Sequence, residues 1–326
     1  MQENPSHSEM LASMTGGMVT PSERFVGSSR LHPNGRPKGA FRDAIRKVPD
    51  FRNFFSVILS LSFPPLIVWM VMVYSHPLIW IFSIFGMGIS QNRLFIIHHE
   101  AAHRLLFSNR IINDLIGIRF IGLLAFGSGS HGYRVGHLKH HRDEFGPEEP
   151  DFIFYSFYPI SKSSMGRKLL RDVSGVSAFK ILRPRFQRLN ELRRLRLTIS
   201  FLSGQLTIAA LFWFFSNLTM YLCLWILPWA CVYQLLNRVR AISEHGGMTQ
   251  SPDRRKTTHY VRQNRLANFF IVPFNVGYHL AHHVDMLVPN RNLPLLNEAL
   301  IEDGYISSDR IWPSYRSLWK ALVTKN

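Results

Sequence analysis

Two long stretches of the chain lack charged side chains, and they set the first expectation about the fold. Residues 54–92 and 197–237 contain no Asp, Glu, Lys or Arg. A membrane-spanning helix needs about 20 apolar residues, so each stretch is long enough for roughly two spans. Each also holds a turn signal near its middle, Ser-His-Pro at residues 75–77 and Ser-Asn at residues 216–217. The pattern therefore predicts two transmembrane hairpins.

The remaining segments predict how these hairpins are flanked. Residues 1–50 are rich in Ser, Gly, Pro and Arg and show no sustained periodicity, so we expect a disordered or loosely ordered basic segment there. The apolar stretch at 111–126 is interrupted by Asp114 and Arg119, and we interpret it as an interfacial or re-entrant helix. One membrane domain should then occupy residues 51–326. Its four spans are expected at about 54–74, 78–97, 198–216 and 218–237.

Charge gives these spans an orientation. The 326-residue chain has a formal net charge of +17, and its Lys and Arg residues are absent from both hairpin turns but dense beside the hairpins. Lys and Arg favour the cytoplasmic side, so both termini are predicted to be cytoplasmic. Because the basic residues lie beside spans, the charge does not indicate nucleic-acid binding. We interpret the Arg-rich run at residues 183–196 as an anchor for anionic headgroups, with docking of an acidic electron carrier as the alternative.

The histidines supply the candidate chemistry. The chain has 15 histidines, and ten of them fall in four short clusters on the predicted cytoplasmic side. Residues three or four apart share one face of a helix, so the members of a cluster can point into a common volume. Imidazole suits iron, copper, nickel and zinc, and so many ligands exceed what one ion uses. We therefore predict an all-α membrane protein of four transmembrane helices in two hairpins, with a cytoplasmic helical cap that carries the histidines and two metal ions. The clustered histidines are His98, His99 and His103; His137, His140 and His141; His245; and His279, His282 and His283.

The other five histidines have no histidine at a spacing useful for metal binding. We predict that they are ordinary surface residues. They are His7, His32, His76, His131 and His259.

A competing motif overlaps the first cluster. His99, Glu100 and His103 also match HExxH, in which two histidines bind zinc and the glutamate activates water. That motif would make the chain a membrane zinc protease. The protease leaves both HxxHH clusters without a role, whereas a two-metal oxidase uses all the clusters. The protease is therefore the remote alternative.

The order of the motifs resembles a known family. A leading pair of histidines and two HxxHH clusters around two membrane hairpins are similar to the membrane fatty acid desaturase and hydroxylase superfamily, and to its bacterial-type fatty acid desaturases. The flanking segments agree, with Glu-Glu-Pro-Asp at 148–151 after the second cluster and Phe-Asn-Val-Gly-Tyr at 274–278 before the last. The resemblance implies that Glu100 orients the ligands. The position of Asp151, close after the second cluster, suggests the same role for Asp151. The iron ligands that it implies are His99, His103, His137, His140, His141, His245, His279, His282 and His283.

Two positions bear on how far the resemblance extends. Both His98 and His99 can lead the first cluster, and both spacings occur in the family. Ala241 stands where animal acyl-CoA desaturases have an asparagine, four residues before the extra histidine. The substrate branch therefore stays open at this point.

The resemblance implies an oxygen-dependent reaction. An unactivated methylene has no acidic proton, so its oxidation needs a metal-oxygen oxidant, here two iron ions with O2. The expected reaction is desaturation of a lipid acyl chain at the cytoplasmic membrane face. Hydroxylation or ketolation of a lipid, alkane or carotenoid is the alternative. Electrons are expected from NAD(P)H through a separate reductase and a ferredoxin or cytochrome b5-like carrier, and the expected location is a bacterial inner membrane.

Overall fold

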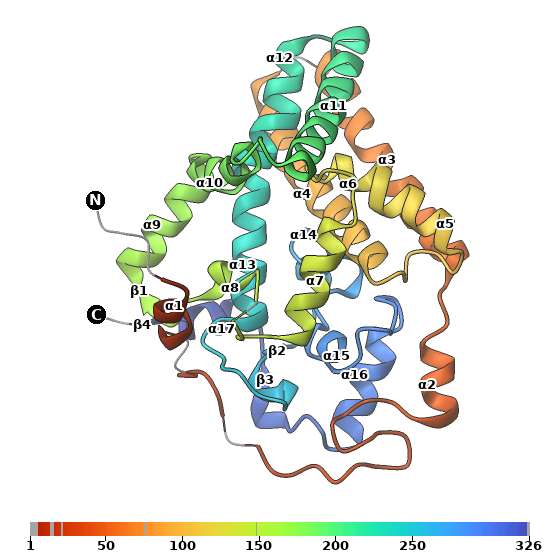
Figure 1. Ribbon diagram of the computed structural model, residues 1–326, viewed down its shortest axis with the longest axis vertical. Helices are drawn as coiled ribbons and strands as arrows, with labels where there is room; N and C mark the ends of the chain where they lie inside the picture. Colours follow the sequence, from red (N-terminus) through yellow and green to blue (C-terminus); the bar gives the residue numbers. More distant parts are fainter. Residues whose placement is uncertain (1–5, 14–15, 21, 75, 148, 325–326) are drawn as a thin grey trace. The chain divides into compact units, whose positions relative to one another are not determined.

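The structure is a computed structural model that describes residues 6–13, 16–20, 22–74, 76–147 and 149–324 (Figure 1). The chain forms two compact units. The first, here called the span unit, consists of Pro49–Tyr133 and Gly166–Asn237. The second, here called the histidine unit, consists of Met1–Val48, Arg134–Met165 and Arg238–Asn326.

The span unit contains the long apolar helices that the charge-free stretches predict. Among the described residues, four helices are long and apolar enough to cross a membrane, and the four predicted spans fall on them. Three are continuous, whereas the fourth is a succession of α-helical and wider π-helical segments whose last part leads into the histidine unit. The continuous helices are α3 (Asp50–Val73), α4 (Pro77–Ala102) and α11 (Leu192–Phe215). The fourth comprises α12 (Leu218–Tyr221), η3 (Leu222–Ile226), η4 (Trp229–Tyr233) and α13 (Gln234–His245).

Helices begin directly after both predicted turns, at residues that suit helix starts. The His76 Nδ1 accepts a hydrogen bond from the backbone N–H of Leu78 at 3.2 Å, and Pro77 occupies the first turn of α4. Asn217 Oδ1 accepts a hydrogen bond from the Met220 N–H at 2.9 Å at the start of α12. These caps satisfy N–H groups that have no partner within their own helix. Proline fits there because it lacks such an N–H group.

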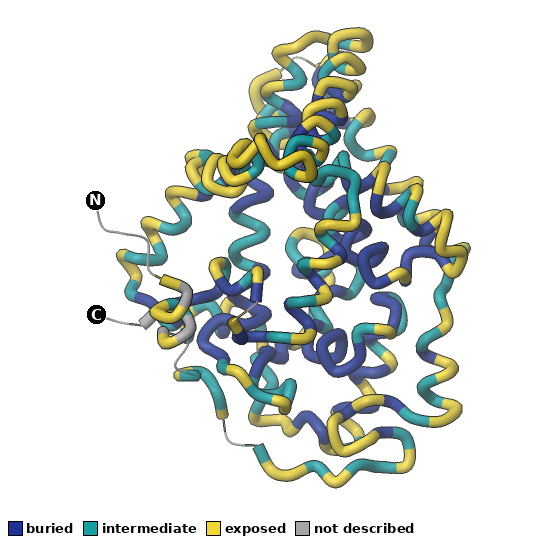
Figure 2. The backbone as a smooth tube through the Cα atoms, viewed as in Figure 1, coloured by how far each residue is buried: buried dark blue, intermediate teal, exposed yellow. Residues whose placement is uncertain are grey.

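The outer surface of these helices is apolar. Trp69 on α3 and Trp213 on α11 are more than half exposed, and Phe214 is 80% exposed. Figure 2 shows how much of the α11 surface is exposed. Soluble proteins rarely expose apolar patches of this size, whereas lipid solvates them at no cost. The span unit therefore has the surface of a membrane protein.

The segment predicted as an interfacial helix, 111–126, is helical as far as Leu124 and packs against α4. A Cβ on Gly117 would lie 2.2 Å from the Ala101 Cβ, so glycine is needed for this close approach. The Asn113 side-chain amide donates to the Ala101 carbonyl at 3.0 Å and its oxygen accepts from the Leu106 N–H at 3.2 Å. These contacts fix the end of α4 that carries the first histidine cluster. Its place at a membrane interface stays a prediction. The elements are α5 (Arg110–Ile112), η1 (Asn113–Phe120) and α6 (Ile121–Leu124).

The histidine unit consists of short helices and two pairs of parallel strands of two residues each. The strand β1 (Ile160–Ser161) pairs with β4 (Val323–Thr324), and β2 (Tyr260–Val261) pairs with β3 (Ile311–Trp312). These pairs are the departure from the all-α expectation, and the other named elements are helices. The helices are α1 (His7–Ser13), α2 (Gly39–Ile45), α7 (Gly132–Arg142), α8 (Phe152–Tyr155), η5 (Arg254–Lys256), α14 (Arg265–Phe270), η6 (Pro273–Asn275), α15 (His279–Val284), α16 (Leu293–Glu302), η7 (Ser308–Arg310) and α17 (Tyr315–Ala321). The helix α9 (Lys162–Val173) leads from this unit into the span unit, where α10 (Val176–Leu182) and η2 (Arg183–Phe186) follow.

A hydrophobic core holds α15 in place. Every residue of α15 is buried (Figure 2). Burying a leucine side chain contributes roughly 1.5–3 kcal/mol, so the core gives the histidines of α15 a rigid support. The side chains packed with Leu280 and Val284 of α15 include Leu293, Leu296 and Leu300 of α16, together with Leu31, Ile45 and Tyr305.

Residues 1–50, predicted to be disordered or loosely ordered, contain positions that are packed in this core. Leu31 and Ile45 are buried there. Arg30 forms an ion pair with Asp303 at 2.9 Å and Arg46 one with Asp285 at 2.7 Å. Residues 1–5, 14–15 and 21 lie outside the described residues. The division of the chain at residue 50 stays a prediction.

Candidate metal centre

Four buried histidines of the histidine unit converge on one point. His140 comes from α7, His245 from the end of α13, and His279 and His283 from α15. One ring nitrogen of each lies within 4.8 Å of those of the others. The Nε2 atoms of His245 and His279 are 3.1 Å apart. We call these residues the four-histidine group.

Three members of the four-histidine group are held from behind through Nδ1. The His140 Nδ1 bonds to the Glu149 carboxylate at 2.8 Å, and the His245 Nδ1 bonds to the Thr257 carbonyl at 2.8 Å. Carbonyl and carboxylate oxygens only accept, so each Nδ1 is the donor. Each ring, in its neutral form, then has its lone pair on Nε2. Metal-ligating histidines are oriented in this way. The third pair joins the His283 Nδ1 to Glu144.

The donor set fits a metal ion. Because its Nδ1 is the donor, His245 directs the lone pair of its Nε2 at the Nε2 of His279. Two ring nitrogens that face each other in this way are stabilised by a proton or a cation between them. The buried Nε2 of His283 has no hydrogen-bond partner among the described residues, whereas the Nδ1 of His279 lies 3.5 Å from a carboxylate oxygen of Glu244. Burial lowers the pKa of His279 well below its ordinary value, and the neighbouring His245 lowers it further. Neutral, buried imidazoles that point at one another are suitable ligands for iron or zinc.

Two acidic residues, Glu149 and Asp151, lie close to His140. Burial is the largest single effect on the pKa of this histidine and lowers it. The hydrogen bond to Glu149 and the negative charges of Glu149, Asp151 and Glu144 together outweigh burial and raise the pKa to about 9. The backbone N–H of Asp151 donates to Glu149 Oε1 at 2.8 Å. Burial raises the pKa of Asp151, whose carboxylate lies within the same small group as His140 and Glu149. The Asp151 carboxylate thus lies within 4.8 Å of a His140 ring nitrogen, and its supporting role stays a prediction.

Glu144 and Arg254 extend the support of His283. Arg254 forms an ion pair with Glu144 at 2.6 Å and donates to the His141 carbonyl at 2.9 Å. Burial raises the pKa of Glu144, and the Arg254 charge opposes that rise. Sequence reasoning missed these two residues. The signal it lacked is spatial, because Glu144 and His283 are 139 positions apart in the chain.

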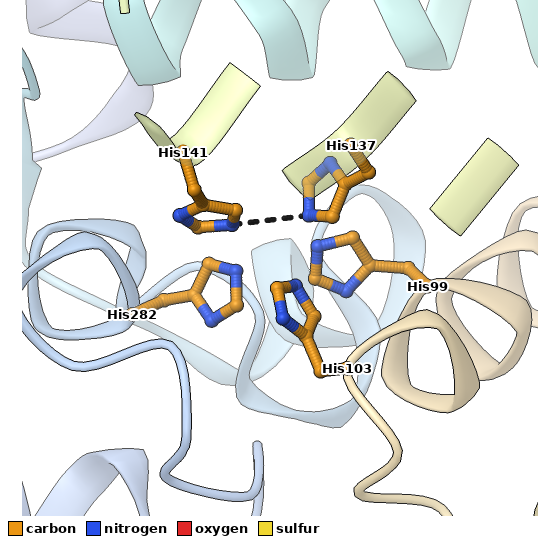
Figure 3. A group of neighbouring side chains, drawn as sticks. All are labelled: His99, His103, His137, His141 and His282. Carbon is orange, nitrogen blue, oxygen red and sulfur yellow. Dashed lines mark hydrogen bonds between the residues drawn. The ribbon is translucent and has the colours of Figure 1, made fainter. Parts of the chain in front are cut away.

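A second set of histidines lies on the same two helices. His137 and His141 of α7 place their Nε2 atoms 3.1 Å apart, and the ring centroid of His282 on α15 is 4.7 Å from that of His141. All three are buried. Ring nitrogens of all three lie within 4.8 Å of one another. Figure 3 shows these three side chains and also draws His99 and His103. We call His137, His141 and His282 the three-histidine group.

The end of α4, in the span unit, carries the histidines of the first cluster. His99 and His103 are buried and their ring centroids are 4.9 Å apart. His98 points elsewhere, since its Nδ1 bonds to the Gly117 carbonyl at 2.8 Å and its ring stacks on Tyr133. His99, and not His98, therefore pairs with His103. Glu100 is buried on the same turn of the helix.

One of the histidines predicted to be a surface residue is buried. His259 is 5% exposed, and its Nε2 bonds to the Gly246 carbonyl at 2.7 Å. Burial lowers its pKa to about 4, against a smaller opposing effect of that hydrogen bond. The surface prediction was therefore wrong for His259, because its hydrogen-bond partner is a backbone carbonyl that no side-chain spacing reveals. His131 is half exposed, as predicted.

Known proteins place the chain in a family. The family model described as fatty acid desaturase matches residues 74–315, which cover all the helices that carry the clustered histidines. The chain belongs to the fatty acid desaturase family. It is also similar to the dihydrorhizobitoxine desaturase of Bradyrhizobium elkanii, with 24% identity over 256 residues and 72% of each chain covered.

Membership of the fatty acid desaturase family fixes the general class of reaction. The chain is an oxidoreductase of the desaturase and hydroxylase type, and the family implies a lipid substrate and O2. Members of this family generally hold two iron ions, and the buried histidine groups are suited to bind metal. The resemblance that the sequence motifs indicate is thereby confirmed.

Proposed function

We propose that this member of the fatty acid desaturase family is a membrane-bound, O2-dependent diiron desaturase that introduces a double bond into a lipid acyl chain. The observation that carries the proposal is the four-histidine group, in which buried imidazoles converge while carbonyl or carboxylate oxygens hold Nδ1 from behind. A polar cluster of this kind is costly to bury unless a ligand compensates it.

The proposal assigns one iron ion to each histidine group. His140, His245, His279 and His283 would hold the first. His99 and His103 of α4 would join the three-histidine group of His137, His141 and His282 to hold the second. Glu100, one residue after His99, would support this ligand set. When bound, iron would supply the capacity to activate O2 that oxidation of an unactivated methylene requires.

The chain's own residues would keep the ligands ready for metal. Glu149 and Thr257 hold the Nδ1 protons of His140 and His245, which leaves each Nε2 free to bind. Glu144 does the same for His283, and Arg254 compensates its charge. Burial of the whole group excludes water, which strengthens each of these interactions.

The proposed topology follows from the candidate spans. The four helices would form two hairpins whose basic flanks, histidine cap and both termini lie at the cytoplasmic face, as the distribution of Lys and Arg favours. We place the protein in a bacterial inner membrane, where the bacterial origin of the relative supports the assignment. Electrons would arrive from NAD(P)H through a separate reductase and a ferredoxin or cytochrome b5-like carrier.

Desaturation is preferred to oxygen insertion because the relative is named as a desaturase. Its name gives dihydrorhizobitoxine as the compound concerned, whereas the family model points to an acyl chain. The remote zinc protease would use His99, Glu100 and His103 and leave the four-histidine group without a function. It is therefore not proposed further.

Lipid analysis under labelled oxygen tests this proposal. The chain would be expressed in a host that lacks desaturases of this type, beside a His279→Ala variant as the inactive control, under ¹⁸O2. The expected result is new double bonds in the wild-type lipids without label, and none with the variant. Label in a product hydroxyl or keto group would establish oxygen insertion instead. Unchanged lipids with iron-loaded protein and a competent electron donor would contradict both reactions.

A further inference from the structure

A strongly basic segment of the span unit has no role in the proposed reaction. Residues 167–196, here called the basic arm, contain ten Lys or Arg residues and two acidic ones, a net charge of +8. Both acids have partners within the basic arm. Asp172 is fully buried and accepts a hydrogen bond from Ser177, and Glu191 pairs with Arg194 at 2.9 Å. The outward charge of the basic arm is therefore almost purely positive.

Large apolar side chains are exposed between these charges. Leu170, Phe179 and Leu192 are each 60% exposed or more. Exposed apolar side chains alternating with Lys and Arg are typical of segments that lie in the membrane interface, where the apolar groups enter the acyl region and the cations meet headgroups. Smaller exposures of the same kind occur at Val173, Val176, Ile181 and Phe186.

The basic arm is attached to two of the candidate spans at a definite level. The helix α10 packs against η4 of the fourth span. The Thr198 hydroxyl in α11 donates to the Arg185 carbonyl at 2.8 Å, and the Arg185 guanidinium lies 4.4 Å from the Phe201 ring centroid. Arg193 and Arg196 mark the same end of α11, and basic residues at the end of a span lie near the headgroups. The arm thus lies level with the end of a spanning helix.

We propose that the basic arm binds anionic phospholipid headgroups, with Phe179 and Leu170 inserted among the acyl chains. An acidic soluble protein offers the same charge complementarity, but it leaves unexplained why bulky apolar side chains are exposed at the level where α11 ends. Each basic residue near an anionic surface contributes roughly fivefold to partitioning, so the arm dominates the preference of the protein for anionic lipid. The inference goes beyond the proposed reaction and rests only on the membrane-spanning position of α11.

A fluorescent label at residue 179 tests the inference in the full-length protein. Cys223 and Cys231 are first replaced by Ala, and Phe179→Cys is labelled with a polarity-sensitive probe. The protein is placed in nanodiscs of phosphatidylcholine with or without about 30 mol% phosphatidylglycerol, each with and without a lipid-borne quencher. Two labelled controls use Val26→Cys, which is 78% exposed in the histidine unit, and Phe214→Cys on α11.

The expected result is a blue shift and quenching at position 179 that increase strongly with phosphatidylglycerol. Combining Lys180→Gln, Arg183→Gln and Arg188→Gln should remove most of that increase, on the order of a hundredfold in partitioning. No quenching at 179 with full quenching at 214 would overturn the inference and leave the spans intact. Quenching at 179 that does not depend on lipid charge would also overturn the inference. So would a blue shift of the probe that appears only when an acidic carrier protein is added. Iron content, measured on the same samples, reports separately on the metal centre.

Discussion

Replacing Glu144 gives the sharpest test of how the protein holds its ligands. Glu144→Ala removes the partner of the His283 Nδ1 and of the Arg254 guanidinium, which is 2.6 Å away. Glu144 is 4% exposed, so water does not readily take its place. Losing such a carboxylate typically lowers metal affinity by about 10–100-fold, or about 1.4–2.8 kcal/mol. We expect a loss of iron affinity of about 100-fold for Glu144→Ala. For Glu144→Gln we expect about tenfold, because its amide oxygen still accepts a hydrogen bond from the His283 Nδ1.

The assay is competition for ferrous iron between the purified protein and a chelator of known affinity. Circular dichroism of the same samples verifies that the variants are folded. Glu298→Ala is the matched control, because that carboxylate is exposed on α16 of the same unit. Wild-type iron affinity in Glu144→Ala would refute the reasoning, since it would mean that the carboxylate does not position His283 for metal.

Three further predictions concern α4 and one buried histidine. His99→Ala should lower the iron content, whereas His98→Ala should not, because the His98 ring bonds to a backbone carbonyl. Metal analysis of both variants measures this, and an equal loss of iron in both would contradict the assignment. Gly88→Ala should lower the melting temperature, because the added Cβ would lie 2.5 Å from a valine side chain and overpacking costs about 1–3 kcal/mol. The control Gly86→Ala meets only an ordinary van der Waals contact. Equal melting temperatures for the two variants would contradict the close packing at Gly88. The imidazole of His259 has a pKa of about 4 when folded and 6.5 when unfolded, so the unfolded chain binds the proton first and stability falls by about 3 kcal/mol between pH 6.5 and 4. His259→Gln should lose this part of the pH dependence of the melting temperature, and an unchanged dependence would contradict it.

Local patterns made the spans and the histidine triplets predictable. The length of a charge-free stretch directly predicts the number of spans that it can form. The HxxHH spacing places three side chains on one helix, whatever the rest of the fold is. The turn signals worked for the same reason, since His76 and Asn217 cap the helices that they precede. The two triplets then divide between two groups, with His140 in one and His137 and His141 in the other.

Contacts between distant parts of the sequence were not predictable. The His283 and Glu144 pair and the His245 bond to the Thr257 carbonyl depend on how α15, η5 and the loop after α7 meet. Backbone partners explain the burial of His259, and a carbonyl leaves no signal in the sequence. The choice between His98 and His99 likewise depends on η1, which supplies the Gly117 carbonyl.

Metal analysis of purified protein tests the central claim most directly. Iron and zinc per chain are measured for the wild type, for His140→Ala combined with His282→Ala, and for His131→Ala as an exposed-histidine control. The account predicts about two iron ions per chain in the wild type and the control, and a loss of iron in the double variant. About one zinc ion per chain that is retained in the double variant would contradict it.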